Sequence, residues 1–311
     1  MTKIFKQLAR HWAACLAVAA LLIVQAYCDL SLPDYTSKIV DVGIQQGGIE
    51  SSVPYTVRDT TLQALELLMT EDEAALADQW YSGPDADGLR YLSKDADTAA
   101  AELESAFTTP DVVLYMAAAQ NAARVAGSTE TVTPTIYDLD AVSQQFAAMA
   151  QAPGAREMLQ NQLAGALSQL DGTVADNLAS QAVLLVSLEY EAQGIAHDVQ
   201  IAYLLRIGGQ MLGLTLLMVA AAVAVGFIAS RVSAAIGRDL RRKVFSTVVG
   251  YSNAEIEKFS TASLITRTTN DIQQVQFVCV ILLRMVAYAP ILGIGGIMHV
   301  ASGNTGLEWI I

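Results

Sequence analysis

The chain has 311 residues, of which 53% are hydrophobic and only 16% are charged, and its formal net charge is −13. This composition is typical of a membrane protein. The charge is uneven, because residues 45–200 carry five Lys/Arg against 23 Asp/Glu whereas the remainder carries 13 against eight. No stretch suggests a nucleic-acid-binding face, and the three cysteines all lie in apolar runs, which excludes a disulfide framework for the acidic region.

Residues 1–12 are expected to form an amphipathic helix on the cytoplasmic face of the membrane, with apolar side chains on one side and basic ones elsewhere. Residues 13–44 are expected to form the first transmembrane helix. A signal peptide is the alternative for this region, but no convincing small-x-small cleavage site follows the apolar core. A helix over 13–43 would rise roughly 46 Å, more than the ~30 Å hydrocarbon core, so its outer third should project into water.

Residues 45–200 predict an acidic, mainly helical domain on the far side of the membrane. The region is rich in Ala and Gln and lacks long apolar runs. Three segments combine helix-favouring composition with spaced apolar residues. Two other segments are rich in Pro, Gly and Asp, which indicates turns. The expected helices are Thr61–Asp78, Ala141–Gln151 and Glu157–Leu170, and the expected turns are Ser82–Gly88 and Ala152–Gly154.

The remaining chain predicts two more spans separated by a polar loop. Residues 201–252 are expected to form the second transmembrane helix and its cytoplasmic extension, and residues 253–270 the loop. Residues 271–302 are expected to form the third transmembrane helix. Residues 303–311 are expected to be an outer turn and the start of a fourth helix.

Basic residues beside the spans predict the orientation in the cell (plasma or inner) membrane. Lys/Arg residues gather at the N-terminus and over 231–267, so both regions are expected in the cytoplasm. Residues 45–200 are then extracytoplasmic, and membrane lipid is an expected partner.

Known catalytic and metal-binding patterns are missing from the sequence. It contains no GxxxxGK[ST] phosphate loop, HExxH or CxxC, and its three histidines are far apart. We therefore expect no catalytic residue and no metal ligand in this chain. The acidic residues of 45–200 are expected to form a solvated surface, since no pair stands out as an acid–base couple.

The order of residues in the polar loop is more informative about function than the composition of the loop. The stretch RDLRRKVF is followed by NAEIEKFSTASLITRTTNDIQQVQ, and it resembles the first intracellular loop of the transmembrane domain of ATP-binding-cassette (ABC) exporters. The pairs Leu32-Pro33, Val40-Asp41 and Gly43-Ile44 are also similar to the first helix of that family. The resemblance covers residues 1–45 and 200–311.

The resemblance implies an all-α membrane protein: the first three of six type IV ABC exporter transmembrane helices, with a mainly helical extracytoplasmic insert. It also implies a short coupling helix that docks on a nucleotide-binding domain, followed by a junction that relays closure of that domain to the third helix. The coupling helix would be Asn253, Ala254, Glu255, Ile256, Glu257, Lys258 and Phe259, and the junction Ser263, Leu264, Thr266, Arg267, Thr269, Asn270 and Asp271.

The same resemblance implies partners and cofactors. A second half-transporter would complete a homodimer or heterodimer, and the nucleotide-binding domain would be a later part of the protein or a separate chain. ATP and Mg²⁺ would bind there, with no cofactor held by this chain. Two features depart from the family: about 150 residues separate the first two spans, and Ala262 stands where Gly is common.

Two charged residues within spans are candidates for lining a translocation cavity. Asp29 lies four residues before Pro33 in the first span, and Arg284 lies in the third. Such charges usually face a protein interior or an aqueous cavity, although Asp29 could simply reach water and Arg284 could extend to the interface.

A membrane sensory receptor is the alternative function. A span, an outer ligand-binding domain, a second span and a basic cytoplasmic segment would suit that class. The third apolar run argues against it, because a receptor's second span should lead to a soluble signalling segment.

Overall fold

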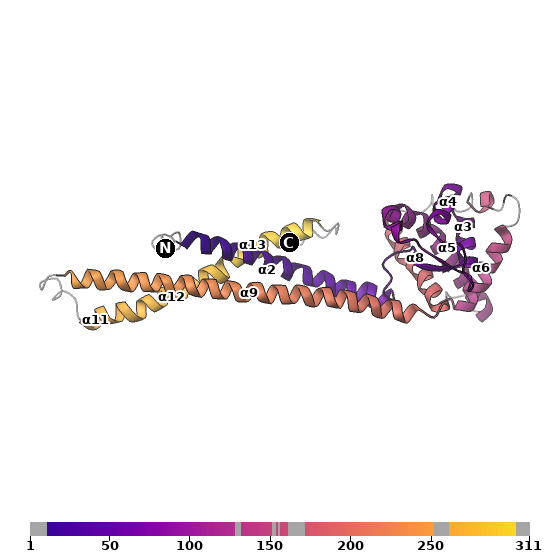
Figure 1. The fold of residues 1–311 in the computed structure, drawn as a ribbon. Helices are drawn as coiled ribbons and strands as arrows, with labels where there is room; N and C mark the ends of the chain where they lie inside the picture. Colours follow the sequence, from indigo (N-terminus) through magenta and orange to yellow (C-terminus); the bar gives the residue numbers. More distant parts are fainter. Residues whose placement is uncertain are drawn as a thin grey trace. The chain divides into compact units, whose positions relative to one another are not determined.

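The computed structural model describes residues 11–127, 132–150, 154, 156–160, 172–251 and 261–302. The chain divides into two compact units, one of residues Met1–Thr36 and Gly208–Ile311 and the other of residues Ser37–Ile207. Figure 1 labels their helices and strands along the chain.

The first unit is built from long apolar helices. Three described segments are long and apolar enough to cross a membrane: Trp12–Gln45, Ala196–Val249 and Ser263–His299. They agree with the three expected spans. The helical elements that contribute to this unit are α2 (Trp12–Lys38), α9 (Ala196–Val249), α11 (Thr261–Thr266), η4 (Arg267–Asp271), α12 (Ile272–Ile281), η5 (Leu282–Val286) and α13 (Tyr288–Ser302).

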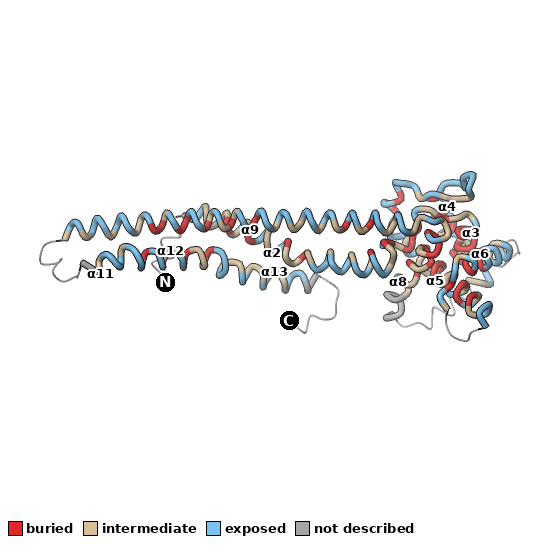
Figure 2. Tube along the Cα trace, turned by 90° about the horizontal axis from the view of Figure 1, so that it is seen from below, coloured by how far each residue is buried: buried red, intermediate tan, exposed pale blue. Residues whose placement is uncertain are grey.

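Within this unit α9 packs against α2 and against the α12–α13 segment. Val225 of α9 lies in one apolar cluster with Val18 and Leu22 of α2. Further along, Ile236 lies in a second cluster with Cys279 of α12. Both clusters are small, and most of the remaining apolar surface of these helices is exposed (Figure 2), as expected of helices that face lipid.

The second unit is a helical domain with one short antiparallel strand pair. Its elements are η2 (Ile39–Gln45), β1 (Thr56–Arg58), α3 (Asp59–Leu68), α4 (Glu71–Trp80), β2 (Leu89–Tyr91), η3 (Lys94–Ala99), α5 (Ala100–Ala126), α6 (Ile136–Ala150) and α8 (Gly172–Ala192). The strands pair in the register Thr56 with Tyr91 and Arg58 with Leu89. The connection between α4 and β2 contains the expected turn, in which Gly88 has φ +74°.

The core of this domain lies among α3, α5, α6 and α8. Its fully buried side chains include Leu62, Leu65, Phe107, Leu139 and Leu185. Burial of large apolar side chains is its main source of stability, since the described cysteines are all free.

Two of the three helices expected in this domain differ from the prediction in their number or their bounds. The segment Thr61–Asp78 is two helices, because Thr70 starts α4 with a capping box in which its side chain accepts a hydrogen bond from the backbone N–H of Glu73. The expected helix at Ala141–Gln151 is part of α6, which begins at Ile136. Only residues 157–160 of Glu157–Leu170 are described, and they are helical.

Candidate functional site

The predicted coupling helix falls outside the described residues, whereas the predicted junction is described. The predicted coupling helix lies within residues 252–260, which are outside the described part of the chain, and it consists of Asn253, Ala254, Glu255, Ile256, Glu257, Lys258 and Phe259. The junction residues Ser263, Leu264 and Thr266 lie in α11, and Arg267, Thr269, Asn270 and Asp271 lie in η4. Their helical conformation continues directly into α12.

The second part of the junction is a π-helical turn, in which two threonine hydroxyl groups donate to backbone carbonyls four residues earlier. Thr268 Oγ1 donates to Leu264 O at 2.7 Å, and Thr269 Oγ1 donates to Ile265 O at 2.9 Å. Single π-helical turns inside α-helices are frequent at functional sites. The side chains of Arg267, Asn270 and Asp271 are exposed and available to a partner.

An apolar groove lies between this junction and the end of α9. It has a volume of about 350 Å³ and is lined by Val244, Phe245, Val248, Leu264, Ile265, Thr268 and Thr269. Phe245 is 69% exposed and Ile265 is 60% exposed. The second and third long helices therefore remain neighbours up to the ends that flank residues 252–260.

Two hydrogen bonds and a close approach join α9 to α12. Ser233 Oγ donates to Gln276 O at 2.6 Å, and Arg241 Nη2 donates to Gln276 Oε1 at 3.2 Å. The Gln276 side chain lies over Gly237, where an added Cβ would be 2.8 Å from its Cγ. A side chain at position 237 would have to displace Gln276, so the glycine allows α9 and α12 to pack closely at this level.

Asp29 has a hydroxyl partner from the third long helix. Tyr288 Oη of α13 donates to Asp29 Oδ2 of α2, and Asp29 is half-buried. At another level of the same two helices, His299 Nε2 lies 3.1 Å from Asp34 Oδ2. Asp29 is thus joined to Tyr288, and the other candidate, Arg284, lies in η5 with an exposed side chain.

The domain of residues 37–207 buries charged groups as well. Glu189 is 1% exposed and accepts hydrogen bonds from Arg58 Nε at 3.0 Å and Thr61 Oγ1 at 3.0 Å. Asp111 is fully buried, and burial, followed by the nearby carboxylates Glu104 and Glu189, raises its pKa well above the ordinary value. Burial also raises the pKa of Glu66 to about 7.

These groups do not form a recognisable catalytic or metal site. Among the described residues, no cluster of three or more His, Cys, Asp or Glu side chains could hold a metal ion. Glu189 is paired with Arg58, which is the arrangement expected of a buried carboxylate with a structural role, whereas the two carboxyl oxygens of Asp111 are buried without a hydrogen-bond partner.

The contacts of Gln276, Ser233 and Tyr288 were not predicted from the sequence. Each joins residues at least 35 positions apart, and single polar residues inside apolar helices gave no indication of their partners. The usable signal was the rarity of polar side chains inside a span, which identified Asp29 and could also have identified Gln276.

Comparisons with known proteins associate the chain with ABC transporters. It is 33% identical over 138 residues to an uncharacterized ABC transporter ATP-binding protein of Mycobacterium tuberculosis (strain CDC 1551 / Oshkosh), covering 44% of this chain and 24% of the relative. It is 36% identical over 104 residues to the uncharacterized ABC transporter ATP-binding protein YfiB of Bacillus subtilis (strain 168), covering 33% of this chain and 18% of the relative.

The chain therefore spans about a quarter or less of the length of these curated relatives. No family model matches the chain, and no solved structure matches it. Three helices able to cross a membrane and relatives named as ABC transporter proteins together indicate a membrane-associated protein related to ABC transporters.

Proposed function

We propose that this chain is the transmembrane (permease) part of an ATP-driven ABC exporter that moves its cargo across the cell membrane by alternating access. The observation that carries the proposal is the position of the loop motif: residues 253–271 follow the second candidate span and lead into the third. The ABC transporter names of the relatives support the same assignment.

The proposed mechanism is a rigid lever. Residues 253–259 would dock on a nucleotide-binding domain, where ATP and Mg²⁺ bind. The contacts of Gln276 with α9 and the packing of the junction beside Phe245 support joint movement of the second and third helices. Closure of the nucleotide-binding domains of two half-transporters would then be transmitted to the spans.

The sensory-receptor alternative is less well supported. A receptor needs no third span, whereas Ser263–His299 is long and apolar enough to cross the membrane. The relatives carry the names of ABC transporter proteins and not of receptors.

Asp29 is proposed to line the translocation cavity and to favour cationic or polar cargo. Its hydrogen bond with Tyr288 gives a competing structural role in joining α2 to α13. Asp29→Asn and Tyr288→Phe in the complete transporter separate the two roles. A change in cargo preference with Asp29→Asn alone supports cavity lining, and unchanged transport with Asp29→Asn refutes it.

The extracytoplasmic domain is proposed to act as a lid or as a docking surface for a partner. Its first and last residues connect directly to the first two spans, so its movements can reach them. Deletion of residues 48–189 in a correctly inserted transporter should change the transport rate or the range of cargo. No change in either would refute this role.

Reading the coding sequence beyond Ile311 is the first test of the exporter proposal. Three further apolar spans followed by a GxxxxGK[ST] loop are expected. A stop codon at that point, with no separately encoded ATPase that cross-links to the Glu257→Cys variant, would overturn the proposal.

A further inference from the structure

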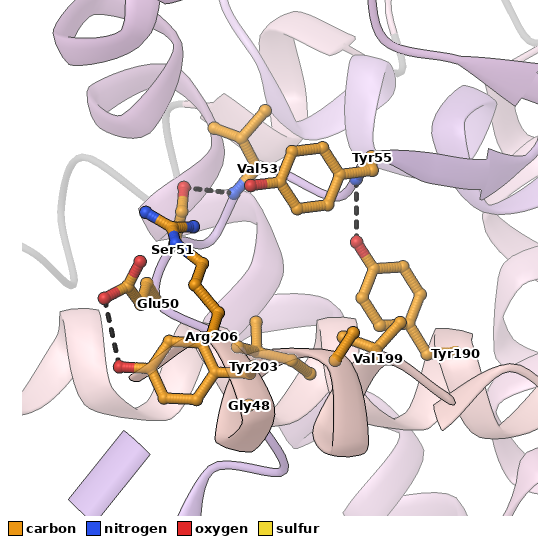
Figure 3. A pocket seen from close by; sticks show the side chains of 11 residues that line it. Gly48, Glu50, Ser51, Val53, Tyr55, Tyr190, Val199, Tyr203 and Arg206 are labelled. Carbon is orange, nitrogen blue, oxygen red and sulfur yellow. Dashed lines mark hydrogen bonds between the residues drawn. The ribbon is translucent and has the colours of Figure 1, made fainter. Parts of the chain in front are cut away.

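A cavity of about 280 Å³ lies within the unit of residues 37–207 and has no role in the proposed coupling. It is lined by Gly48, Ile49, Glu50, Ser51, Val53, Tyr55, Tyr190, Val199, Ala202, Tyr203 and Arg206 (Figure 3). The lining combines aliphatic side chains, three tyrosines, one acidic group and one basic group. This mixture is typical of ligand sites, in which an apolar wall is combined with a few placed polar groups.

The backbone around Gly48 forms one wall of the cavity. Gly48 has φ +84°, and a Cβ there would lie 2.9 Å from Cα of Gln200 in α9. Glycine therefore allows the chain to turn sharply against the helix and to pass along it toward β1. The turn brings residues 49–55 opposite residues 190–206, which come from the far end of this unit.

Hydrogen bonds fix two of the tyrosine rings. Tyr190 Oη accepts a hydrogen bond from the backbone N–H of Tyr55 at 2.7 Å, and Tyr190 is 2% exposed. Tyr203 Oη donates to Glu50 Oε1 at 3.1 Å. These contacts hold the rings in place before any ligand arrives, which lowers the entropy cost of binding.

The two charged groups of the lining have opposite signs and can bind the two charges of one small zwitterion. Both Glu50 and Arg206 are exposed, and Figure 3 shows the Arg206 side chain extending across the cavity toward Ser51 and Glu50. A guanidinium binds phosphate through a planar pair of N–H donors. The Glu50 carboxylate keeps acceptor sites beyond the one that Tyr203 uses, and these can bind an ammonium group.

We propose that this cavity binds a small zwitterion in which a phosphate and a primary ammonium group are joined by a short linker. Arg206 binds the phosphate and Glu50 binds the ammonium, while Ile49, Val53 and Val199 contact the linker. The volume of about 280 Å³ lies just below the ~300–1,000 Å³ of sites that enclose drug-sized ligands, which suits a lipid headgroup and not a whole lipid.

This ligand chemistry has two sources, a phospholipid headgroup or a free phosphodiester. Arg206 directly precedes the apolar run of α9 that begins at Ile207. Tyrosine and arginine side chains are enriched at the boundary between lipid and water, where headgroups are abundant. The headgroup is therefore the source that this position favours.

Binding of glycerophosphoethanolamine to the full chain tests the proposal. The chain is purified in a maltoside detergent and titrated by calorimetry with glycerophosphoethanolamine, glycerol 3-phosphate or ethanolamine. We expect saturable binding of the zwitterion, at least tenfold tighter than that of either single-charge compound. Arg206→Gln and Glu50→Gln should each weaken it at least tenfold, whereas Arg124→Gln and Glu71→Gln, outside the cavity, should not.

Nanodiscs distinguish the two sources. Loss of glycerophosphoethanolamine binding in discs that contain phosphatidylethanolamine, with binding kept in phosphatidylglycerol discs, identifies the lipid headgroup as occupant. Binding kept in both discs identifies a free zwitterion. Absence of saturable binding in detergent, equal affinity for a single-charge compound, or binding unaffected by both cavity variants would overturn the proposal. None of these results depends on ATP hydrolysis or on the exporter assignment.

Discussion

Replacing Arg58 by methionine should strongly destabilise the domain of residues 37–207. The Glu189 side chain is 2% exposed and the Arg58 side chain 21% exposed. Arg58 donates to Glu189 from Nε, from Nη2 at 2.9 Å and from its backbone N at 2.8 Å. Methionine keeps much of the apolar stem of arginine but removes the charge, so Glu189 would remain as a buried carboxylate without its cation.

The expected cost follows from the remaining partners of Glu189. Removing one member of a buried ion pair costs about 3–5 kcal/mol. The lower end applies, because Arg58 is partly exposed and Glu189 keeps hydrogen bonds from the Arg58 backbone N–H, Thr61 and Gln193. We therefore expect a loss of about 3 kcal/mol in the free energy of unfolding.

A double-mutant cycle with Glu189→Gln isolates the buried charge. Alone, Glu189→Gln should cost about 2 kcal/mol, because hydrogen bonds to a charged group become neutral ones. In the Arg58→Met background it should cost less than about 1 kcal/mol or stabilise the domain, because it removes an uncompensated charge. The two substitutions should therefore be strongly non-additive.

Urea unfolding of the full chain in detergent measures these effects. Trp80, which packs against the domain core, becomes the only tryptophan when Trp12 and Trp309 are changed to phenylalanine. The exposed Arg124→Met is the control and should change stability by less than about 0.5 kcal/mol. Additivity of Arg58→Met and Glu189→Gln within about 0.5 kcal/mol would show that the reasoning about the buried charge is wrong.

Three further predictions concern pH, helix packing and orientation. Because the pKa of Glu66 rises from 4.5 to about 7 on folding, the folded state binds this proton more tightly, so its contribution favours folding below pH 4.5 and is lost as pH rises toward 7. Urea midpoints of the wild type and Glu66→Gln should diverge over that range, and parallel curves would contradict the shift. Gly237→Ala should lower the melting temperature in detergent, because the added methyl group displaces the Gln276 side chain. The control Gly226→Ala has open space at Cβ, so it should leave the melting temperature unchanged or raise it through the higher helix propensity of alanine. Equal changes in melting temperature for the two variants would show that the close approach of Gln276 to Gly237 does not matter for stability. In a cysteine-free background, Asp87→Cys should react with a membrane-impermeant maleimide in intact cells and Arg242→Cys only after permeabilisation, and the reverse pattern would overturn the proposed orientation.

The spans could be predicted because they depend on local composition alone. A run such as residues 207–229 needs no partner to be recognised, since any helix with its hydropathy and length can cross a membrane. The sequence also indicates the start of α4, because Thr70 and Glu73 have the spacing of a capping box. Our prediction of one helix over Thr61–Asp78 gave this signal too little weight.

The long helix α5 shows a different limit. Its buried Leu103, Phe107 and Leu114 recur at helical spacing, but Pro110 lies among them and suggests a helix end. The structure continues the helix through the proline, which is itself buried. Packing against α8 and α3 can compensate for the lost backbone hydrogen bond, and this compensation depends on residues far away in the sequence.

The candidate sites depend most on such distant pairings. Glu50 and Arg206 are 156 positions apart, and Asp29 and Tyr288 are 259 apart. A sequence indicates that a charge in an apolar run needs a partner, because burial without one is costly, but it does not indicate which helix supplies the partner. The partner changes the functional argument: an Asp29 that accepts a hydrogen bond from Tyr288 can hold two spans together, so its charge alone is insufficient evidence that it selects cargo.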